Sequence, residues 1–371
     1  MLSLRDALDV VETCPVDNDF DGRIGLRVSA IFVIMVSSAI GVFFPVISSR
    51  NTFLKMPSWC FFAAKFFGSG VIISTAFIHL LQPANEALTT ECLGGVYMEY
   101  PWAFGIALMS LFALFLSELI AYRLIDKKVE KLNNHSHLHF GDESVFVKKD
   151  ESETDDEAAT GNKQPSEQEN AVDVATVAAY GAHYSHALEH QDPEVMGTPA
   201  EDLDREVYYG QLLNVFVLEF GILFHSVFIG LTLAVAGEEF NTLYVVLVFH
   251  QMFEGFGLGS RIATTKFNKK HQMTPWFLCI AFSLVTPIAV AIGLGVRESY
   301  PPGGRVNLIT NGIFDAISAG ILIYTGLIEL MAHEFLFSNE FKGEGGFQKM
   351  MFAYGIMCVG AGLMALLGKW A

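Results

Sequence analysis

The chain has few charged residues for its length. Only 17% of its 371 residues are Asp, Glu, Lys or Arg, whereas 52% are hydrophobic, and the mean hydropathy is +0.40. Soluble domains rarely combine such values. The net charge of −17 is unevenly placed, because residues 125–208 hold 20 acidic and 7 basic side chains and so carry −13 of it. A stretch this polar cannot bury enough apolar surface to fold. We therefore predict a disordered loop there and no nucleic-acid partner.

The sequence also lacks the motifs of several enzyme classes. No Walker motif is present, which argues against ATP-driven pumping, and the one His-Glu pair, His333-Glu334, does not continue into HExxH. None of the five cysteines has CxxC spacing, so a zinc ribbon or a redox motif is not indicated. We expect neither an enzyme nor a cofactor. A membrane-embedded metalloenzyme, which needs an open metal position and a general base, stays as an alternative.

Long apolar runs dominate what is present. A helix needs about 20 apolar residues to cross a hydrocarbon core, and eight stretches are long enough. The segment 1–23 has no basic n-region, and the first apolar run is too long for a cleaved signal peptide, so it is kept as a span. The eight stretches are 24–47, 60–83, 101–124, 209–236, 242–264, 275–297, 309–331 and 350–369. The prediction is an all-α integral membrane protein, with transmembrane helices 1–3 in 24–124 and helices 4–8 in 209–371.

Basic residues near the ends of these stretches predict the orientation. Thirteen Lys and Arg lie in or beside the connections 48–59, 125–208, 265–274 and 332–349, against six on the opposite side. Cytoplasmic loops carry the excess of basic residues, so these connections are predicted to be cytoplasmic and both termini to lie outside. Cys14 and Cys92 then fall on the outer side, where disulfides persist, but the sequence leaves open whether they pair.

One internal repeat is visible. The segments SGVIISTAFIHLL (69–81) and AGILIYTGLIELM (319–331) align without gaps and are identical at five positions, including Gly70/Gly320 and Thr75/Thr325. Under the orientation above they cross the membrane in opposite directions. An inverted repeat is typical of secondary transporters that bind their substrate near the bilayer midplane.

Polar residues interrupt the fourth and fifth apolar stretches. His250 and Glu254 are four positions apart and so share one helix face. The short connection at 237–241 predicts an antiparallel helical hairpin, in which His225 lies 14 positions before residue 239 and Glu254 lies 15 after it. At an equal rise per residue the two reach the same depth, about 21 Å from the tip. Ionisable side chains in a membrane are costly, so their convergence predicts a function.

Two histidines and a carboxylate favour Zn²⁺ or Fe²⁺, and the absence of a thiolate argues against Cu⁺. At this point HSVFIG (225–230) and HQMFEGFGLGSRI (250–262) resemble the signature of the ZIP (Zrt-, Irt-like protein) family of divalent-metal transporters, in particular fungal plasma-membrane zinc importers. FGSGVIISTAFIHLL (67–81) and DAISAGILIYTGLIELMAHEF (315–335) support the likeness, which spans nearly all the apolar stretches.

The resemblance implies eight helices and a transport site on helices 4 and 5. It places His225, His250 and Glu254 at the metal, with Ser226 and Gln251 at the neighbouring positions. Some relatives carry further acids where this chain has Ile229 and Thr286, so a single well-formed site is favoured over a two-metal centre.

Other polar residues extend a path from this site. His79 shares a face with Gln82 and Glu86, and Asp315 and His333, 18 positions apart on the seventh stretch, share another with Glu329 close by. We assign His79, Gln82, Asp315, Glu329 and His333 to a transport pathway, with Glu329 and His333 at its inner end. The cluster of His135, His137 and His139 in the long loop predicts cytosolic metal binding.

The sequence therefore predicts a multi-pass plasma-membrane protein that brings Zn²⁺ into the cytosol, with the metal ion as substrate. A broader divalent-metal transporter for Fe²⁺, Cd²⁺ or Mn²⁺ is the alternative, and a metal-sensing receptor remains conceivable. The driving force, the affinity and the formation of a homodimer are left open.

Overall fold

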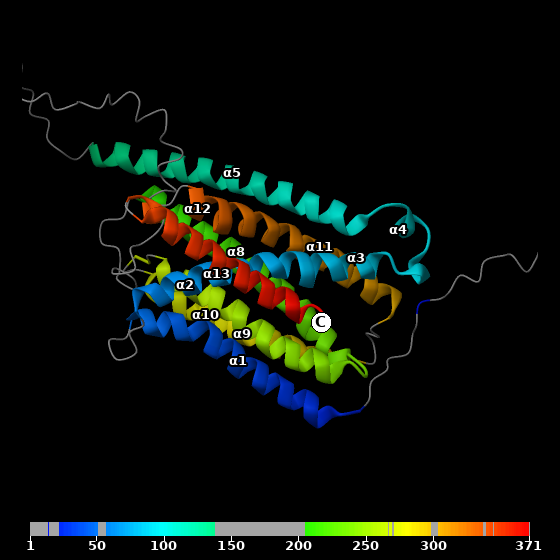
Figure 1. Ribbon diagram of the computed structural model, residues 1–371. Helices are drawn as coiled ribbons and strands as arrows, with labels where there is room; N and C mark the ends of the chain where they lie inside the picture. Colours follow the sequence, from blue (N-terminus) through cyan, green and yellow to red (C-terminus); the bar gives the residue numbers. More distant parts are fainter. Residues whose placement is uncertain are drawn as a thin grey trace, which may run out of the picture.

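The computed structural model describes residue 14 and residues 22–50, 57–137, 205–265, 267–268, 271–297, 303–336, 339–343 and 345–370. These residues form a bundle of long helices (Figure 1). His139, which was predicted to lie in the long loop, and most of the acidic segment 125–208 lie outside the described residues. The long helical segments are α1 (Ile24–Arg50), α2 (Ser58–Ser74) continued by η1 (Thr75–Leu81) and α3 (Gln82–Leu88), α5 (Trp102–His137), α8 (Arg205–Val235), α9 (Phe240–Thr264), α10 (Thr274–Val296), α11 (Arg305–Tyr324) continued by η5 (Thr325–His333) and α12 (Glu334–Leu336), and α13 (Gly346–Leu367).

Each of the eight predicted spans lies within one of these segments or matches it to within a few residues. Seven of the segments in the described part of the chain are long and apolar enough to cross a membrane. The segment that falls short is α9, which carries His250, Gln251 and Glu254 among its apolar residues. These polar residues lower the mean hydropathy of α9.

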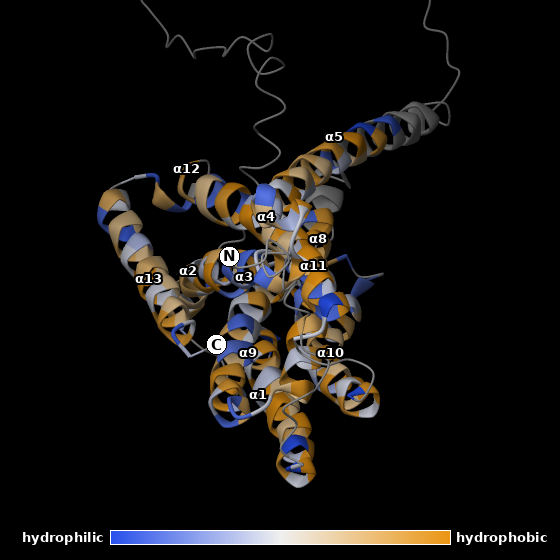
Figure 2. Cartoon of the chain, turned by 90° about the vertical axis from the view of Figure 1, so that its right-hand side faces the viewer, coloured by the Kyte–Doolittle hydropathy of each residue, from blue (hydrophilic) through white to orange (hydrophobic). Residues whose placement is uncertain are grey.

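The outer surface of the bundle is apolar. Phe32 of α1, Leu108 of α5 and Phe277 of α10 are each more than half exposed, with exposed fractions of 58%, 56% and 65%. Figure 2 shows hydrophobic residues along the helices at the periphery of the bundle. Such a surface suits contact with lipid chains, and the backbone polar groups beneath it are satisfied within the helices, as a membrane requires.

The predicted repeat is matched by local structure. The α-helix changes to π-helical turns at Thr75 in the first copy and at the aligned Thr325 in the second. Figure 1 shows α2 to α3 and α11 to α12 running in opposite directions. The aligned glycines Gly70 and Gly320 are both at close helix contacts: a Cβ on either would meet a backbone carbonyl, that of Met357 on α13 or that of Ala107 on α5.

The packing of the helices follows the same correspondence. The α1 helix packs along α9 as α10 packs along α8, and α2 packs against α13 as α11 packs against α5. Across the centre, α2 contacts α9 and α11 contacts α8. The α8–α9 hairpin therefore lies between two similar groups of helices, which places its polar residues in the middle of the bundle.

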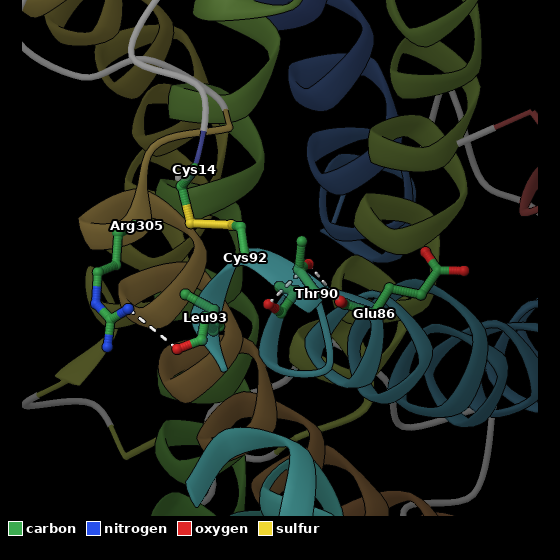
Figure 3. The surroundings of a disulfide bond; sticks show 7 residues. Cys14, Glu86, Thr90, Cys92, Leu93 and Arg305 are labelled. Carbon is green, nitrogen blue, oxygen red and sulfur yellow. Dashed lines mark hydrogen bonds between the residues drawn. A yellow bond between two sulfur atoms is a disulfide. The ribbon is translucent and has the colours of Figure 1, made fainter. Parts of the chain in front are cut away.

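A disulfide joins Cys14 to Cys92, which settles the pairing left open above (Figure 3). Next to it, Arg305 at the start of α11 donates a hydrogen bond to the carbonyl of Leu93 at 3.0 Å. The α8–α9 connection and the end of α3 lie at this same end of the bundle (Figure 1), which we call the hairpin end. The opposite end, where α9 and α12 finish, is called the loop end.

A buried arginine connects α1 to the end of α8 at the hairpin end. Arg27 of α1 is fully buried and donates hydrogen bonds to the carbonyls of Leu233, Ala234 and Ala236, where α8 ends. Its guanidinium also lies 4.4 Å from the centre of the Phe240 ring at the start of α9. The last carbonyls of a helix have no partner within the helix, so Arg27 satisfies groups that would otherwise be buried without hydrogen bonds.

Candidate metal site

The α8–α9 hairpin brings three candidate ligands together in the interior. His225 comes from α8, and His250 and Glu254 come from successive turns of α9. The exposed fractions of the three residues are 0%, 1% and 0%. Each offers one ligand atom, and these atoms all lie within 4.8 Å of one another. The convergence predicted from the hairpin spacing is thus present in the structure.

The distances suit a small divalent cation. His250 Nε2 lies 3.7 Å from the Oε2 of Glu254. Ligand atoms that share a tetrahedral zinc ion, at about 2.0–2.1 Å from the metal, lie roughly 3.3 Å apart. Small side-chain adjustments would therefore bring the three ligand atoms onto one ion.

The polar atoms of this group have no hydrogen-bond partners in the protein. Both ring nitrogens of His225, the Nε2 of His250 and both carboxylate oxygens of Glu254 are buried and unpartnered. Buried polar atoms are normally hydrogen-bonded, because leaving one unsatisfied costs about 1–3 kcal/mol. An ion bound between them would compensate for that cost, whereas a purely structural cluster would leave it uncompensated.

Ser226 and Gln251, the predicted neighbours, lie beside the three ligands. Both are fully buried, and the amide nitrogen of Gln251 donates a weak hydrogen bond to Ser226 Oγ at 3.4 Å. The Oε1 of Gln251 has no partner and remains available as an oxygen ligand.

His79 of η1 adds a third imidazole next to the group. Its ring centre is 4.7 Å from that of His250, and its Nε2 donates a hydrogen bond to the carbonyl of Met364 on α13 at 2.9 Å. Because a carbonyl only accepts, Nε2 carries the proton and Nδ1 keeps its lone pair. Metal-binding histidines usually show this arrangement, with the second nitrogen hydrogen-bonded to a carbonyl or a carboxylate.

A cavity opens from His250 toward the hairpin end. Its volume is about 160 Å³, and it is lined by His79, Asp315, His250 and Thr232 together with apolar residues of η1, α3, α8 and α9. Ile229, the position at which some relatives carry an acid, is one of these apolar residues. Gln82, predicted to share this path, instead donates a hydrogen bond to Glu86, and both side chains are exposed.

The other predicted pathway residues lie toward the loop end. Glu329 and His333 are both in η5, where Glu329 Oε2 is 4.0 Å from His333 Nδ1. The same carboxylate oxygen accepts a hydrogen bond from Asn214 of α8 at 2.9 Å. The prediction that Asp315 and His333 share one face assumed an unbroken α-helix. The π-helical turns of η5 lie between the two residues and change the angle between their side chains.

Sequence reasoning missed two features of the interior. Asn214 was not assigned to the pathway, since a lone Asn on an apolar helix gives little signal. The buried Lys65 and Glu334 form a group of charges with the partly buried Arg261 at the loop end, and Lys65 within an apolar stretch was a signal of it in the sequence. Of the loop histidines, His135 and His137 belong to the last turn of α5, and their side chains lie outside the described residues.

An all-helical bundle with an apolar exterior, seven candidate spans in its described part and a buried His/His/Glu group that could hold a metal ion defines a multi-pass membrane protein with a candidate cation site in its interior. The comparison with protein families gives the particular kind: the ZIP zinc transporter family matches residues 24–368. The chain belongs to this family. It is thus a zinc transporter rather than an enzyme, and zinc is its substrate rather than a cofactor.

Curated relatives resemble the chain over its whole length. Zinc-regulated transporter 2 of Saccharomyces cerevisiae is 50% identical over an alignment of 426 positions that covers all of both chains. Zinc-regulated transporter 1 of the same yeast is 38% identical and covers 98% of this chain and 93% of its own. Zinc-regulated transporter 1 of Schizosaccharomyces pombe is also 38% identical, over 97% of this chain and 89% of its own.

Proposed function

We propose that this protein imports Zn²⁺ into the cytosol by binding it between α8 and α9 through His225, His250 and Glu254. The observation that carries the proposal is the group of buried, unpartnered ligand atoms at the centre of the bundle. Two neutral imidazoles and one carboxylate suit zinc in both ligand type and number, and leave a fourth position for Gln251, His79 or water.

The proposed path runs from the hairpin end to the loop end. Zinc enters the cavity lined by Asp315 and His79, where a carboxylate and an imidazole replace part of its hydration shell. It then passes to the central site and leaves past Glu329 and His333, which lie further along the α11–η5 segment.

The disulfide supports the predicted orientation. Cys14 precedes α1 and Cys92 follows α3, so a bond between them requires both segments to be on one side of the membrane. Disulfides persist in oxidising compartments, which favours the extracellular side for the hairpin end. We therefore propose eight transmembrane helices, both termini outside, and the plasma membrane as the location. The acidic segment 125–208, with His135, His137 and His139, is then cytoplasmic and is proposed to bind zinc there.

The antiparallel repeat supports transport by alternating access. Two similar halves that cross the membrane in opposite directions can expose a central site first to one side and then to the other. In this structure the cavity reaches His250 from the hairpin end, so we assign the structure to the outward-facing state of the transporter.

A broader divalent-metal specificity is the second candidate. Imidazole and carboxylate ligands also suit Fe²⁺, and the unpartnered Oε1 of Gln251 offers the oxygen that harder ions prefer. Competition by Fe²⁺, Mn²⁺ and Cd²⁺ against zinc separates the two specificities.

Uptake of zinc by liposomes that contain the purified full-length protein tests the proposal. His225→Ala and Glu254→Ala should each abolish uptake, because each removes a direct ligand. His271→Ala, which removes an exposed histidine, is the matched control and should transport normally. Uptake near the wild-type rate by either ligand variant would show that the ion does not pass through this site.

A further inference from the structure

A network of ion pairs closes the loop end of the bundle beneath the metal site. Arg261 of α9 forms an ion pair with Glu334 of α12 through its Nη1. Its Nη2 donates a hydrogen bond to Ser69 Oγ of α2 at 3.0 Å. Lys65 of α2 lies 3.5 Å from the second carboxylate oxygen of Glu334 and 3.3 Å from Glu340. One carboxylate therefore holds two cations from two different helices.

The carboxylate at the centre of this network is buried, and the two cations beside it are largely shielded from solvent. Glu334 is fully buried, and the side chains of Lys65 and Arg261 are 7% and 12% exposed. Removing one partner of a buried pair leaves an uncompensated charge, so such a group tends to stay intact in one conformation. Any movement of α9 against α2 and α12 must break it.

The position of Arg261 relates the network to the metal site. It follows Glu254 by seven residues and His250 by eleven, close to whole numbers of helical turns, so all three share one face of α9. Leu258, between Glu254 and Arg261, is fully buried. Close by, α9 touches α2 so tightly that a Cβ on Gly257 would lie 2.8 Å from the Cα of Gly68.

The two ends of the site are thus unequal. Toward the hairpin end a cavity reaches His250, whereas toward the loop end the same face of α9 is covered by Leu258 and then by a guanidinium.

We propose that Arg261, Glu334, Lys65 and Ser69 form an inner lock that keeps the zinc site closed toward the cytoplasm until α9 moves away from α2 and α12. The inference rests on the proposed direction of transport and goes beyond it, because it names the contacts that must break before release. Glu334 is the centre of the lock, and Arg261 is the part carried by the metal-binding helix.

Accessibility of single cysteines tests the lock without any measurement of zinc transport. In a full-length protein whose free cysteines Cys60, Cys279 and Cys358 are replaced by alanine, Leu258→Cys reports on the inner path and Thr232→Cys on the outer cavity. A membrane-impermeant maleimide is applied to inside-out and right-side-out membrane vesicles, and the rates of labelling are compared.

Arg261→Gln should speed labelling at position 258 from the cytoplasmic side and slow labelling at position 232 from the outside. The change should be about tenfold or more, because a conformation populated at about 0.1–10% becomes a major one. Lys349→Gln is the matched control: it removes a cation from the same end of the bundle, but from an exposed pair with Glu340. It should change neither rate.

The Arg261→Gln/Glu334→Gln double variant is the control for misfolding caused by an unpaired buried charge, because it removes both members of this ion pair. It should give the same opposite changes at the two reporters. Unaltered labelling at position 258 in both variants, or faster labelling at both reporters, as partial unfolding would produce, overturns the lock. If the lock holds but the liposome assay shows no zinc uptake, the proposed function fails while the conformational result stands.

Discussion

His250 and Glu254 lie one turn apart on α9 with 3.7 Å between Nε2 and Oε2, and neither of these atoms has a hydrogen-bond partner in the protein. A buried imidazole and a carboxylate so close would be expected to share a proton or a cation. With His225 on α8 close to both, the group has the ligand types and spacing that could hold a small divalent ion between two adjacent helices.

Ser226 and Gln251 should influence which ion is carried more than whether an ion is carried. Their side chains contact each other beside the three ligands at a weak 3.4 Å hydrogen bond. We expect Ser226→Ala to leave zinc uptake within about tenfold of the wild type, as for partners outside the first coordination shell, while altering competition by Fe²⁺ or Cd²⁺. Uptake measured at fixed free zinc with increasing competitor checks this. Complete loss of uptake in Ser226→Ala would instead make the hydroxyl a necessary ligand.

Residues at the two ends of the path should affect different kinetic constants. Asp315 lines the cavity at the hairpin end, so Asp315→Asn should raise the zinc concentration needed for half-maximal uptake with little change in the maximal rate. His333→Ala, at the loop end, should lower the maximal rate because release becomes slower. Uptake rates of both variants, measured over a range of zinc concentrations, give the two kinetic constants. The reverse assignment of the two effects would mean that zinc enters from the loop end.

Arg27 is expected to be structural, and its loss should destabilise the bundle. It donates to three backbone carbonyls where α8 ends, and each buried carbonyl left unsatisfied costs about 1–3 kcal/mol. The temperature midpoint of unfolding in detergent should therefore be clearly lower for Arg27→Met than for the wild type. The control is Arg23→Met, which removes an exposed arginine that donates to Asn241. Equal midpoints for the two variants would show that water or another group satisfies the carbonyls.

The Cys14–Cys92 disulfide gives a test of orientation. Intact cells should show no labelling of these cysteines by an impermeant maleimide, and labelling should appear after treatment with an impermeant reductant. Variants with Cys60, Cys279 and Cys358 replaced by alanine make the signal specific. If labelling required permeabilised cells, the hairpin end would face the cytoplasm and the proposed direction of the path would be reversed.

Much of the architecture could be predicted from the sequence because membrane helices follow simple rules. Apolar runs of sufficient length indicate spans, and the short connection after α8 determines the antiparallel hairpin and hence the common depth of His225 and Glu254. The residues at the centre were predictable because charge in an apolar helix has to be compensated.

What could not be predicted depended on contacts between distant segments. The pairing of Arg261 with Glu334, and of Asn214 with Glu329, joins residues more than 70 positions apart, which no local pattern indicates. The π-helical turns at Thr75 and Thr325 also have no reliable sequence signal, although the repeat made them occur at aligned positions. Gln82 had helical spacing from His79, yet its partner is Glu86 at the surface rather than the path.

Zinc K-edge X-ray absorption of the purified, zinc-loaded protein tests the central claim most directly. We expect nitrogen and oxygen ligands with zinc–nitrogen distances of about 2.0–2.1 Å and imidazole scattering that weakens in both His225→Ala and His250→Ala. The His271→Ala variant should give the wild-type spectrum. A sulfur shell at about 2.3 Å, or imidazole scattering that is unchanged in both ligand variants, would contradict a zinc site formed by His225, His250 and Glu254.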